Sequence, residues 1–220
     1  MIKLVIFDLD GTLLNTIDDL ASSCNYLLRK YHLPEHTTDQ YRYFVGNGIP
    51  KLLERMLPAH LKTDREFRGV LLEEFLDHYA QHKADLTAPY QGIPELLAAL
   101  RDNHIAIAVA SNKVHEAIEP LLKHYFPDIP FAASFGQRAG FPLKPDAAVV
   151  EAILEVVQVD KGETLYVGDT GVDMQTAVNA NVMAIGALWG FRTKEEILDA
   201  GAHCVVTSPL EILKIMDSLA

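Results

Sequence analysis

The stretch KLVIFDLDGTLLNT, residues 3–16, decides how the rest of the chain is interpreted. Its apolar run ends abruptly in Asp8 and Asp10, which are followed by Gly11 and Thr12. Moving a carboxylate out of water is costly unless a group of opposite charge meets it. The two aspartates therefore either form a structural turn before the glycine, as Asp-Gly pairs often do, or hold a cation and take part in chemistry.

The composition is that of a folded globular protein. The chain has 220 residues, of which 49% are apolar, and a formal net charge of −11. This length suits one large domain or a main domain with an insertion. The acidic balance argues against a nucleic-acid binder, which needs a basic face. The longest apolar candidate for a membrane span, VMAIGALWGF at 182–191, is about half the length needed, so no membrane partner is expected.

The two cysteines, Cys24 and Cys204, lie far apart and form no CxxC pattern. They predict neither a disulfide framework nor a zinc knuckle. Met1 leads straight into the first strand-like run, so no secretory signal is predicted. We therefore expect a cytoplasmic protein with reduced thiols.

Short apolar runs alternate with helical patterns in the C-terminal part of the chain. Strands are expected at 105–111, 131–135, 164–169, 182–188 and 203–208. Their nearly continuous apolar character suits strands that are covered on both faces in a parallel sheet. Strands that alternate with helices predict βαβ units and a doubly wound α/β fold.

The segment from 15 to 87 differs in its hydrophobic pattern, which is helical throughout. Thr16 with Asp19 three residues later is a helix-start signal, and the patterns continue over 48–57 and 65–82. We expect residues 1–14 and 88–220 to form an α/β catalytic core. Residues 15–87 are expected to form an all-helical cap domain inserted after the first strand.

Ligands bind at the carboxyl ends of the strands in open parallel sheets, where the loops converge. The polar residues at the expected strand ends, with one lysine before a helix, are Asp8, Asp10, Ser111, Asn112, Lys144, Asp169 and Asp173. Taken singly, most have a simple structural interpretation. Ser111 and Asn112 could cap the next helix, Asp169 could be an N-cap with Asp173 in its first turn, and Lys144 could be a solvated surface lysine.

Taken together, these residues indicate phosphate chemistry. Four carboxylates at one edge of a sheet would repel one another without a cation, and ligands that are all oxygen suit Mg²⁺. A hydroxyl, free N–H groups at a helix start and a lysine suit phosphate oxygens. The set predicts a magnesium-assisted phosphoryl-transfer site with a carboxylate as nucleophile.

Four segments carry a family resemblance that spans nearly the whole chain. DLDGTLLNT (8–16), ASNK (110–113), KPD (144–146) and GDTGVD (168–173) resemble the four motifs of the haloacid dehalogenase-like superfamily. FVGNGIPKLLERML (44–57) and PYQGIPELLAALR (89–101) are similar to segments of its phosphoglycolate phosphatase-like members. Asn15 stands where many relatives have an acid, and Ala147 stands where a second proline often follows the lysine motif.

The resemblance implies a role for each site residue. Asp8 attacks phosphorus to form an aspartyl-phosphate, and Asp10 protonates the leaving oxygen and then activates water. The i, i+2 spacing suits this division, since alternate residues of an extended strand share a face. Mg²⁺ is held by Asp8, the Asp10 carbonyl, Asp169 and, directly or through water, Asp173. The phosphoryl oxygens are held by Thr12, Ser111, Asn112 and Lys144.

The cap is expected to close over the site and exclude water. Gly46, Asn47 and Gly48 would face the leaving group, with Lys51 or Arg55 as partners for a substrate carboxylate. The alternatives are an ordinary turn for the glycines and a solvated helix face for the two cations.

Two further features are ambiguous. His78 and His82 have the i, i+4 spacing of some zinc ligands, but no HExxH pattern and no third ligand accompany them, so we favour a solvated helix face. Trp189 either lines a binding surface or is buried beside the last strands.

The leading hypothesis is a Mg²⁺-dependent phosphatase acting on a small phosphorylated metabolite, with 2-phosphoglycolate as the first candidate. The alternatives are a phosphatase for sugar phosphates, nucleotides or pyrophosphate, a sugar phosphomutase, and a catalytically silent protein that binds a phosphorylated ligand. The sequence leaves the oligomeric state open.

Overall fold

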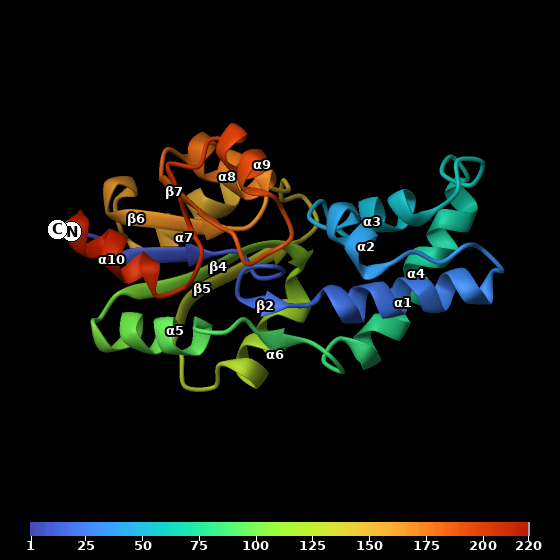
Figure 1. The fold of residues 1–220 in the computed structure, drawn as a ribbon, viewed down its shortest axis with the longest axis horizontal. Coiled ribbons are helices and arrows are strands. Elements are labelled where there is room, and N and C mark those ends of the chain that lie inside the picture. The colour runs from blue at the N-terminus through green and yellow to red at the C-terminus, as the bar shows by residue number, and fades with distance from the viewer. Residues whose placement is uncertain (220) are drawn as a thin grey trace. The chain divides into compact units, whose positions relative to one another are not determined.

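The computed structural model describes residues 1–219 and divides into two compact units. The sheet unit comprises Met1–Leu14 and Pro89–Ala220, and the helical unit comprises Asn15–Ala88. The expected division was 1–14 with 88–220, and 15–87. The two segments that join the units, β2 (Leu14–Asn15) and β3 (Ala88–Pro89), pair with each other as a two-stranded sheet (Figure 1).

Six parallel strands form the main sheet, in the order β5-β4-β1-β6-β7-β8 (Figure 1). The strands are β1 (Leu4–Phe7), β4 (Ala106–Val114), β5 (Phe131–Gln137), β6 (Thr164–Gly168), β7 (Met183–Ala187) and β8 (Cys204–Val206). The chain starts in the middle of the sheet, adds β4 and β5 on one side, and then crosses to add β6, β7 and β8 on the other. The predicted doubly wound parallel fold is confirmed.

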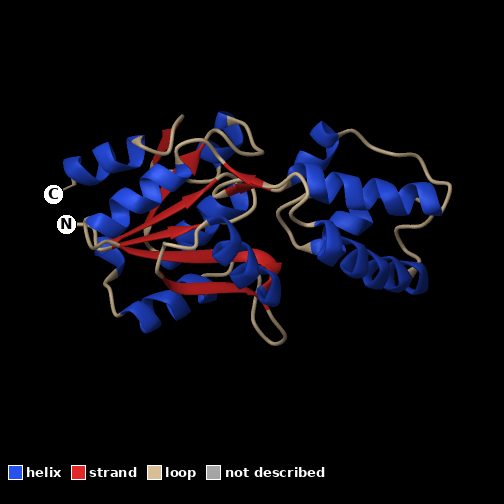
Figure 2. Ribbon diagram, turned by 90° about the horizontal axis from the view of Figure 1, so that it is seen from below, coloured by secondary structure: helices blue, strands red, loops and turns tan. Residues whose placement is uncertain are grey.

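Helices cover both faces of this sheet (Figure 2). They are α5 (Ile93–Asp102), α6 (His115–Tyr125), α7 (Ala148–Val157), α8 (Gly171–Ala180), α9 (Lys194–Asp199) and α10 (Glu211–Ser218), with a short 3₁₀ helix, η1 (Lys161–Glu163). Val5 and Phe7 of β1 belong to the apolar cluster with α5, α6 and α10. Leu4 and Ile6 belong to the cluster with α7, α8 and α9. Burial on both faces explains why the first strand is apolar at every position.

Two strand ends differ from the sequence-based expectation. The strand β4 continues past Ser111 to Val114, and α6 begins only at His115, so Ser111 and Asn112 do not cap that helix. The extension pairs with β5 through the register Val114↔Gln137, after a register irregularity. At the other strand, β1 ends at Phe7, and Asp8 and Asp10 lie beyond it in the connection to β2.

The helical unit contains four helices that bury a small apolar core of their own. They are α1 (Ile17–Lys30), α2 (Thr38–Phe44), α3 (Ile49–Met56) and α4 (Arg65–His82). The helix α1 does begin directly after Thr16, but the Thr16 side chain makes no capping hydrogen bond. Asp19 instead accepts hydrogen bonds from the backbone N–H groups of Leu86 and Thr87, both at 2.9 Å, and from the Thr87 hydroxyl at 2.7 Å. This buried carboxylate therefore links the first helix of the helical unit to the segment at the end of the same unit.

Within residues 1–219, none of the helices combines the length and the apolar character that crossing a bilayer would require.

Candidate active site

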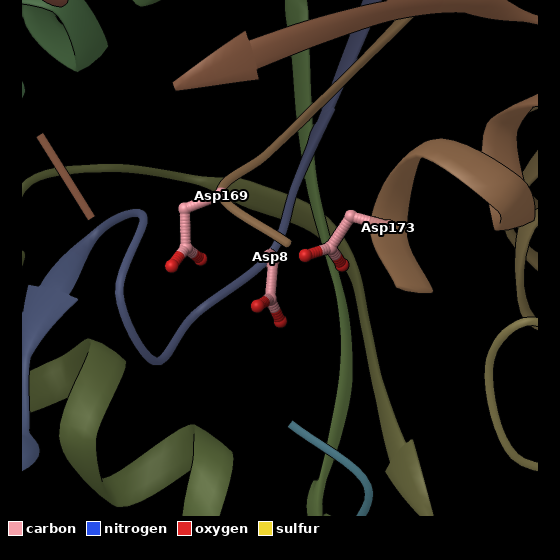
Figure 3. Close-up of side chains that lie close together, drawn as sticks. All are labelled: Asp8, Asp169 and Asp173. Carbon is pink, nitrogen blue, oxygen red and sulfur yellow. The ribbon is translucent and has the colours of Figure 1, made fainter. Parts of the chain in front are cut away.

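Three buried carboxylates meet at the carboxyl ends of two neighbouring strands. Asp8 follows β1, Asp169 follows β6, and Asp173 lies in the first turn of α8 (Figure 3). The backbone N–H of Asp8 donates to the carbonyl of Val167 at 2.9 Å, which aligns the two strand ends. One oxygen from each carboxylate lies within 4.8 Å of the others. Such a set of oxygen donors fits a hard divalent cation such as Mg²⁺.

Lys144 lies among these carboxylates. Its Nζ atom is 2.9 Å from Asp8 Oδ1 and 2.6 Å from Asp173 Oδ1, and the side chain is 3% exposed. The Lys144 ammonium also donates to the carbonyl of Ala110 at 2.9 Å. A solvated surface position, one alternative for this lysine, is therefore wrong.

The loop that carries Lys144 is fixed by Asn112 at the end of β4. The Asn112 side-chain oxygen accepts from the Lys144 backbone N–H at 2.9 Å, and its amide nitrogen donates to the Lys144 carbonyl at 3.2 Å. Ser111 is next to it and also buried, with its hydroxyl oxygen accepting from the Lys113 N–H at 3.2 Å. In this structure the Asn112 side chain positions a loop, and its backbone remains the part predicted to meet phosphate.

The electrostatics of the cluster leave an excess of negative charge. Burial and the Asp173 carboxylate raise the pKa of Asp8 to about 7, although Lys144 opposes the change. Burial and the charges of Asp173 and Asp8 raise the pKa of Asp169 well above its usual value. Burial lowers the pKa of Lys144, but the two carboxylates beside it outweigh burial and leave the pKa well above normal. One lysine does not balance three buried acids, so the site favours an additional cation.

Asp169 is held by close neighbours on two sides. Its Oδ1 accepts from the Thr12 hydroxyl at 3.0 Å, and its Oδ2 accepts from the Phe191 N–H at 2.8 Å. A Cβ atom on Gly11, whose φ is +96°, would lie 2.4 Å from Asp169 Oδ2, and one on Gly190 would lie 2.3 Å from Asp169 Cβ. Both glycines are needed because the backbone approaches the carboxylate closely. The Thr12 hydroxyl, predicted to bind phosphate, is engaged with Asp169 here.

Asp173 is engaged through both of its oxygens. Oδ2 accepts from the Thr170 hydroxyl at 2.6 Å and from its N–H at 3.1 Å, forming a capping box at the start of α8. Thr170, and not Asp169, is therefore the N-cap of this helix. Oδ1 accepts from Lys144 and, at 3.2 Å, from the Tyr166 hydroxyl. These bonds suit a carboxylate that acts on a cation through water.

Asp10 has a lysine partner of its own, Lys113. Lys113 Nζ lies 3.0 and 3.3 Å from the two Asp10 oxygens, and its side chain is 3% exposed. The strand β1 ends at Phe7, and the chain turns after it, with the N–H groups of residues 12–14 returning to the Leu9 carbonyl, so both aspartates lie in the connection after the strand. The turn gives each aspartate its own lysine.

Two site residues, Lys113 and Tyr166, were not singled out in the sequence analysis, and the contact made by Trp189 was not foreseen there. Lys113 stood in the ASNK motif, two positions after Ser111, and alternation along a strand would have placed the two on one face. Tyr166 is a lone phenol in an apolar strand, and Trp189 Nε1 donates to the Thr12 carbonyl at 3.0 Å. Trp189 is also partly buried against the cluster that contains β7 and β8, which agrees with its second interpretation, and its hydrogen bond supports the loop after β1.

The residues predicted for substrate selection lie in the helical unit. Arg55 donates to the Phe44 carbonyl at 2.8 Å and to the Asn47 side-chain oxygen at 2.8 Å, so it holds the loop at Gly46–Gly48 rather than extending into solvent. Lys51 forms an exposed pair with Glu54 at 2.6 Å, which agrees with a solvated helix face.

Comparison with known proteins identifies the family. The model of the haloacid dehalogenase-like hydrolases matches residues 5–187. A phosphoglycolate phosphatase from Aquifex aeolicus is 30% identical over 98% of this chain and 97% of its own length. One from Caulobacter vibrioides is 33% identical over 96% and 89%. The crystal structure of a predicted phosphoglycolate phosphatase from Haemophilus somnus 129pt superposes with a TM-score of 0.90 at 26% identity, covering 98% of each chain.

The chain therefore belongs to the haloacid dehalogenase-like hydrolases, and within that family it is a phosphoglycolate phosphatase-like enzyme, a phosphoric monoester hydrolase.

Proposed function

We propose that this enzyme is a Mg²⁺-dependent phosphatase that hydrolyses a small phosphomonoester through an aspartyl-phosphate, with 2-phosphoglycolate as its first candidate substrate. The observation that carries the proposal is the buried cluster of Asp8, Asp169 and Asp173 around Lys144, with Asp10 held separately by a second lysine. The substrate is suggested by the names of the relatives from Aquifex aeolicus and Caulobacter vibrioides.

Mg²⁺ fits the donor set because every candidate ligand atom is oxygen. Asp8, the Asp10 backbone carbonyl and Asp169 would hold it, with Asp173 acting through water. Bound there, the ion supplies positive charge that offsets the carboxylates and the charge developing on the phosphoryl oxygens.

The side chains divide the remaining work. An Asp8 oxygen attacks phosphorus in line, and Lys144, 2.9 Å from Asp8 Oδ1, keeps that carboxylate oriented. Asp10 gives a proton to the leaving oxygen and later takes one from the attacking water. Thr12, Ser111, the Asn112 backbone and Lys144 hold the phosphoryl oxygens, where positioned donors contribute most of the rate enhancement.

Selection of the substrate is assigned to Gly46, Asn47, Lys51 and Arg55 of the helical unit. The Arg55–Asn47 contact supports a loop of defined shape at this position. In a carboxylated substrate such as 2-phosphoglycolate, the carboxylate would pair with Lys51 or Arg55.

The test is phosphate release from 2-phosphoglycolate, sugar phosphates, nucleotides and pyrophosphate, with and without Mg²⁺. We expect Mg²⁺-dependent release, fastest for 2-phosphoglycolate, and a loss of roughly 10³-fold or more in kcat for Asp8→Asn with Asp128→Asn as the surface control. Retained activity in Asp8→Asn would refute the covalent mechanism.

The same assay separates the competing functions. Phosphate release without a bisphosphate activator argues against a phosphomutase, and any turnover argues against a silent binding protein. A flat response across the substrates would replace 2-phosphoglycolate with a broad substrate range.

A further inference from the structure

A second group of polar side chains lies on the helical unit, where α1 packs against α4. It surrounds a surface cavity of about 410 Å³ that is lined in part by Tyr26, Glu74, His78 and His82. The rings of His78 and His82 stack with centroids 4.4 Å apart and an interplanar angle of 30°. The ring of Tyr26 covers the other face of His78 at 4.1 Å. The two imidazoles are thus ordered against each other rather than separately solvated.

Both imidazoles are held through the same ring atom. His78 Nδ1 lies 3.1 Å from the Ser23 hydroxyl, and His82 Nδ1 lies 2.8 Å from Asp85 Oδ2. Neither Nε2 atom has a hydrogen-bond partner among residues 1–219. Histidines that bind metals through one nitrogen commonly use the other to donate to a carboxylate or another oxygen, which fixes the tautomer. The pair has this second set of contacts already in place.

The surroundings favour a cation at the Nε2 edges. Burial and the neighbouring His82 lower the pKa of His78, which favours the neutral imidazole, the form that binds metals. One turn before His78, Glu74 pairs through Oε1 with Lys30 at 2.8 Å, while its buried Oε2 has no hydrogen-bond partner.

We propose that His78 and His82 form a binding site for one divalent transition-metal ion, of the class of Cu²⁺, Ni²⁺ and Zn²⁺, with water completing the coordination. The two residues lie four positions apart on α4, and their ring centroids are 4.4 Å apart, so rotation of the stacked rings would bring both Nε2 atoms to one ion. Imidazole ligands distinguish this site from the carboxylate cluster, which suits Mg²⁺. The solvated helix face expected from the sequence holds for His82, which is 47% exposed, while His78 is also held by Ser23 and Tyr26.

The site is tested by titrating Cu²⁺ and Zn²⁺ calorimetrically into the full chain with Mg²⁺ at saturation. We expect one site per chain, tighter for Cu²⁺ than for Zn²⁺. His78→Gln and His82→Gln should each weaken binding roughly tenfold or more, and Asp85→Asn several-fold, through loss of its contact with His82. His60→Gln, which alters an exposed histidine of the same unit, is the matched control. Circular dichroism establishes that each variant is folded.

The coordination itself is read by electron paramagnetic resonance of the Cu²⁺ complex. Coupling to two nitrogens is expected in the unaltered protein and to one in either histidine variant. Unchanged affinity in His78→Gln and His82→Gln, or an equal loss in His60→Gln, would overturn the proposal. Because the readout is metal binding and not phosphate release, its failure leaves the proposed phosphatase function untouched.

Discussion

Asp8 is in an environment that penalises its charge, and this has consequences for pH. Its pKa is raised to about 7, mainly by burial and by Asp173, against about 4 in an unfolded chain. The folded protein therefore keeps this proton between pH 4 and 7 while the unfolded chain loses it. In the absence of a metal, this residue lowers the free energy of unfolding as the pH rises through that window.

We predict the opposite pH trend for Mg²⁺ binding. A cation needs the ionised carboxylates, so the affinity should rise from about pH 5 to pH 8 as Asp8, with a pKa of about 7, loses its proton, and the raised pKa of Asp169 acts in the same direction. Calorimetric titration of the metal-free protein at several pH values measures this. An affinity that is constant over this range would show that Asp8 is already ionised at pH 5.

Gly11→Ala should damage the site without removing any functional group. The residue has a φ of +96°, and its added Cβ would lie 2.4 Å from Asp169 Oδ2. We expect a loss of about 1–2 kcal/mol in stability from the backbone conformation, and a weaker Mg²⁺ affinity because Asp169 is displaced. Chemical denaturation and Mg²⁺ titration measure the two effects. Gly162→Ala, where nothing lies near the added Cβ, is the control.

Individual residues differed in how readily the sequence revealed them. Asp169 stood at the end of an expected strand, and Lys144 stood just before an expected helix. The order of strands and helices alone therefore indicated that both residues approach Asp8. Lys113 was missed because the strand was expected to end at Ser111, which left the lysine in a loop. Its burial depends on the longer β4, and that in turn depends on pairing with β5, a contact between distant segments.

Among the elements, the start of α1 has a role beyond beginning a helix. Asp19→Ala removes three hydrogen bonds and leaves the N–H groups of Leu86 and Thr87 without this partner. We expect a loss of about 2–4 kcal/mol in the free energy of unfolding, because hydrogen bonds to a buried charge are strong. Denaturant unfolding measures it, with Asp18→Ala as the matched control. Equal effects of the two substitutions would mean that only the charge near the helix start matters.

Sequence patterns located the elements well where burial is uniform. The strand expected at 182–188 is Met183–Ala187, and the helix expected after Thr16 begins at Ile17. The capping signal itself was misleading, since Asp19 bonds to residues 67 and 68 positions away rather than to its own helix end. Local spacing does not contain such long-range partners.

On the scale of the whole molecule, the two units need not unfold together, so a single melting temperature is a poor description. Trp189 is the only tryptophan and contacts Thr12 in the sheet unit, so its fluorescence reports that unit. At a Mg²⁺ concentration of about one hundred times Kd, we predict a rise of about 5–10 °C in this transition, from about 2.7 kcal/mol of binding free energy. Asp169→Asn should lose most of the rise. An equal rise in that variant would place the ion elsewhere.

The pairing of β2 with β3 has a consequence for how this protein could change over evolution. The chain leaves the sheet unit and returns to it through two adjoining strands. The segment between these strands is therefore an insertion that can be replaced as a whole. Exchanging residues 15–88 for a foreign insert with closely spaced ends would leave the six-stranded scaffold and its acidic cluster continuous. A change of substrate thus requires replacement of the helical unit only, and the residues that cleave the phosphate ester stay the same.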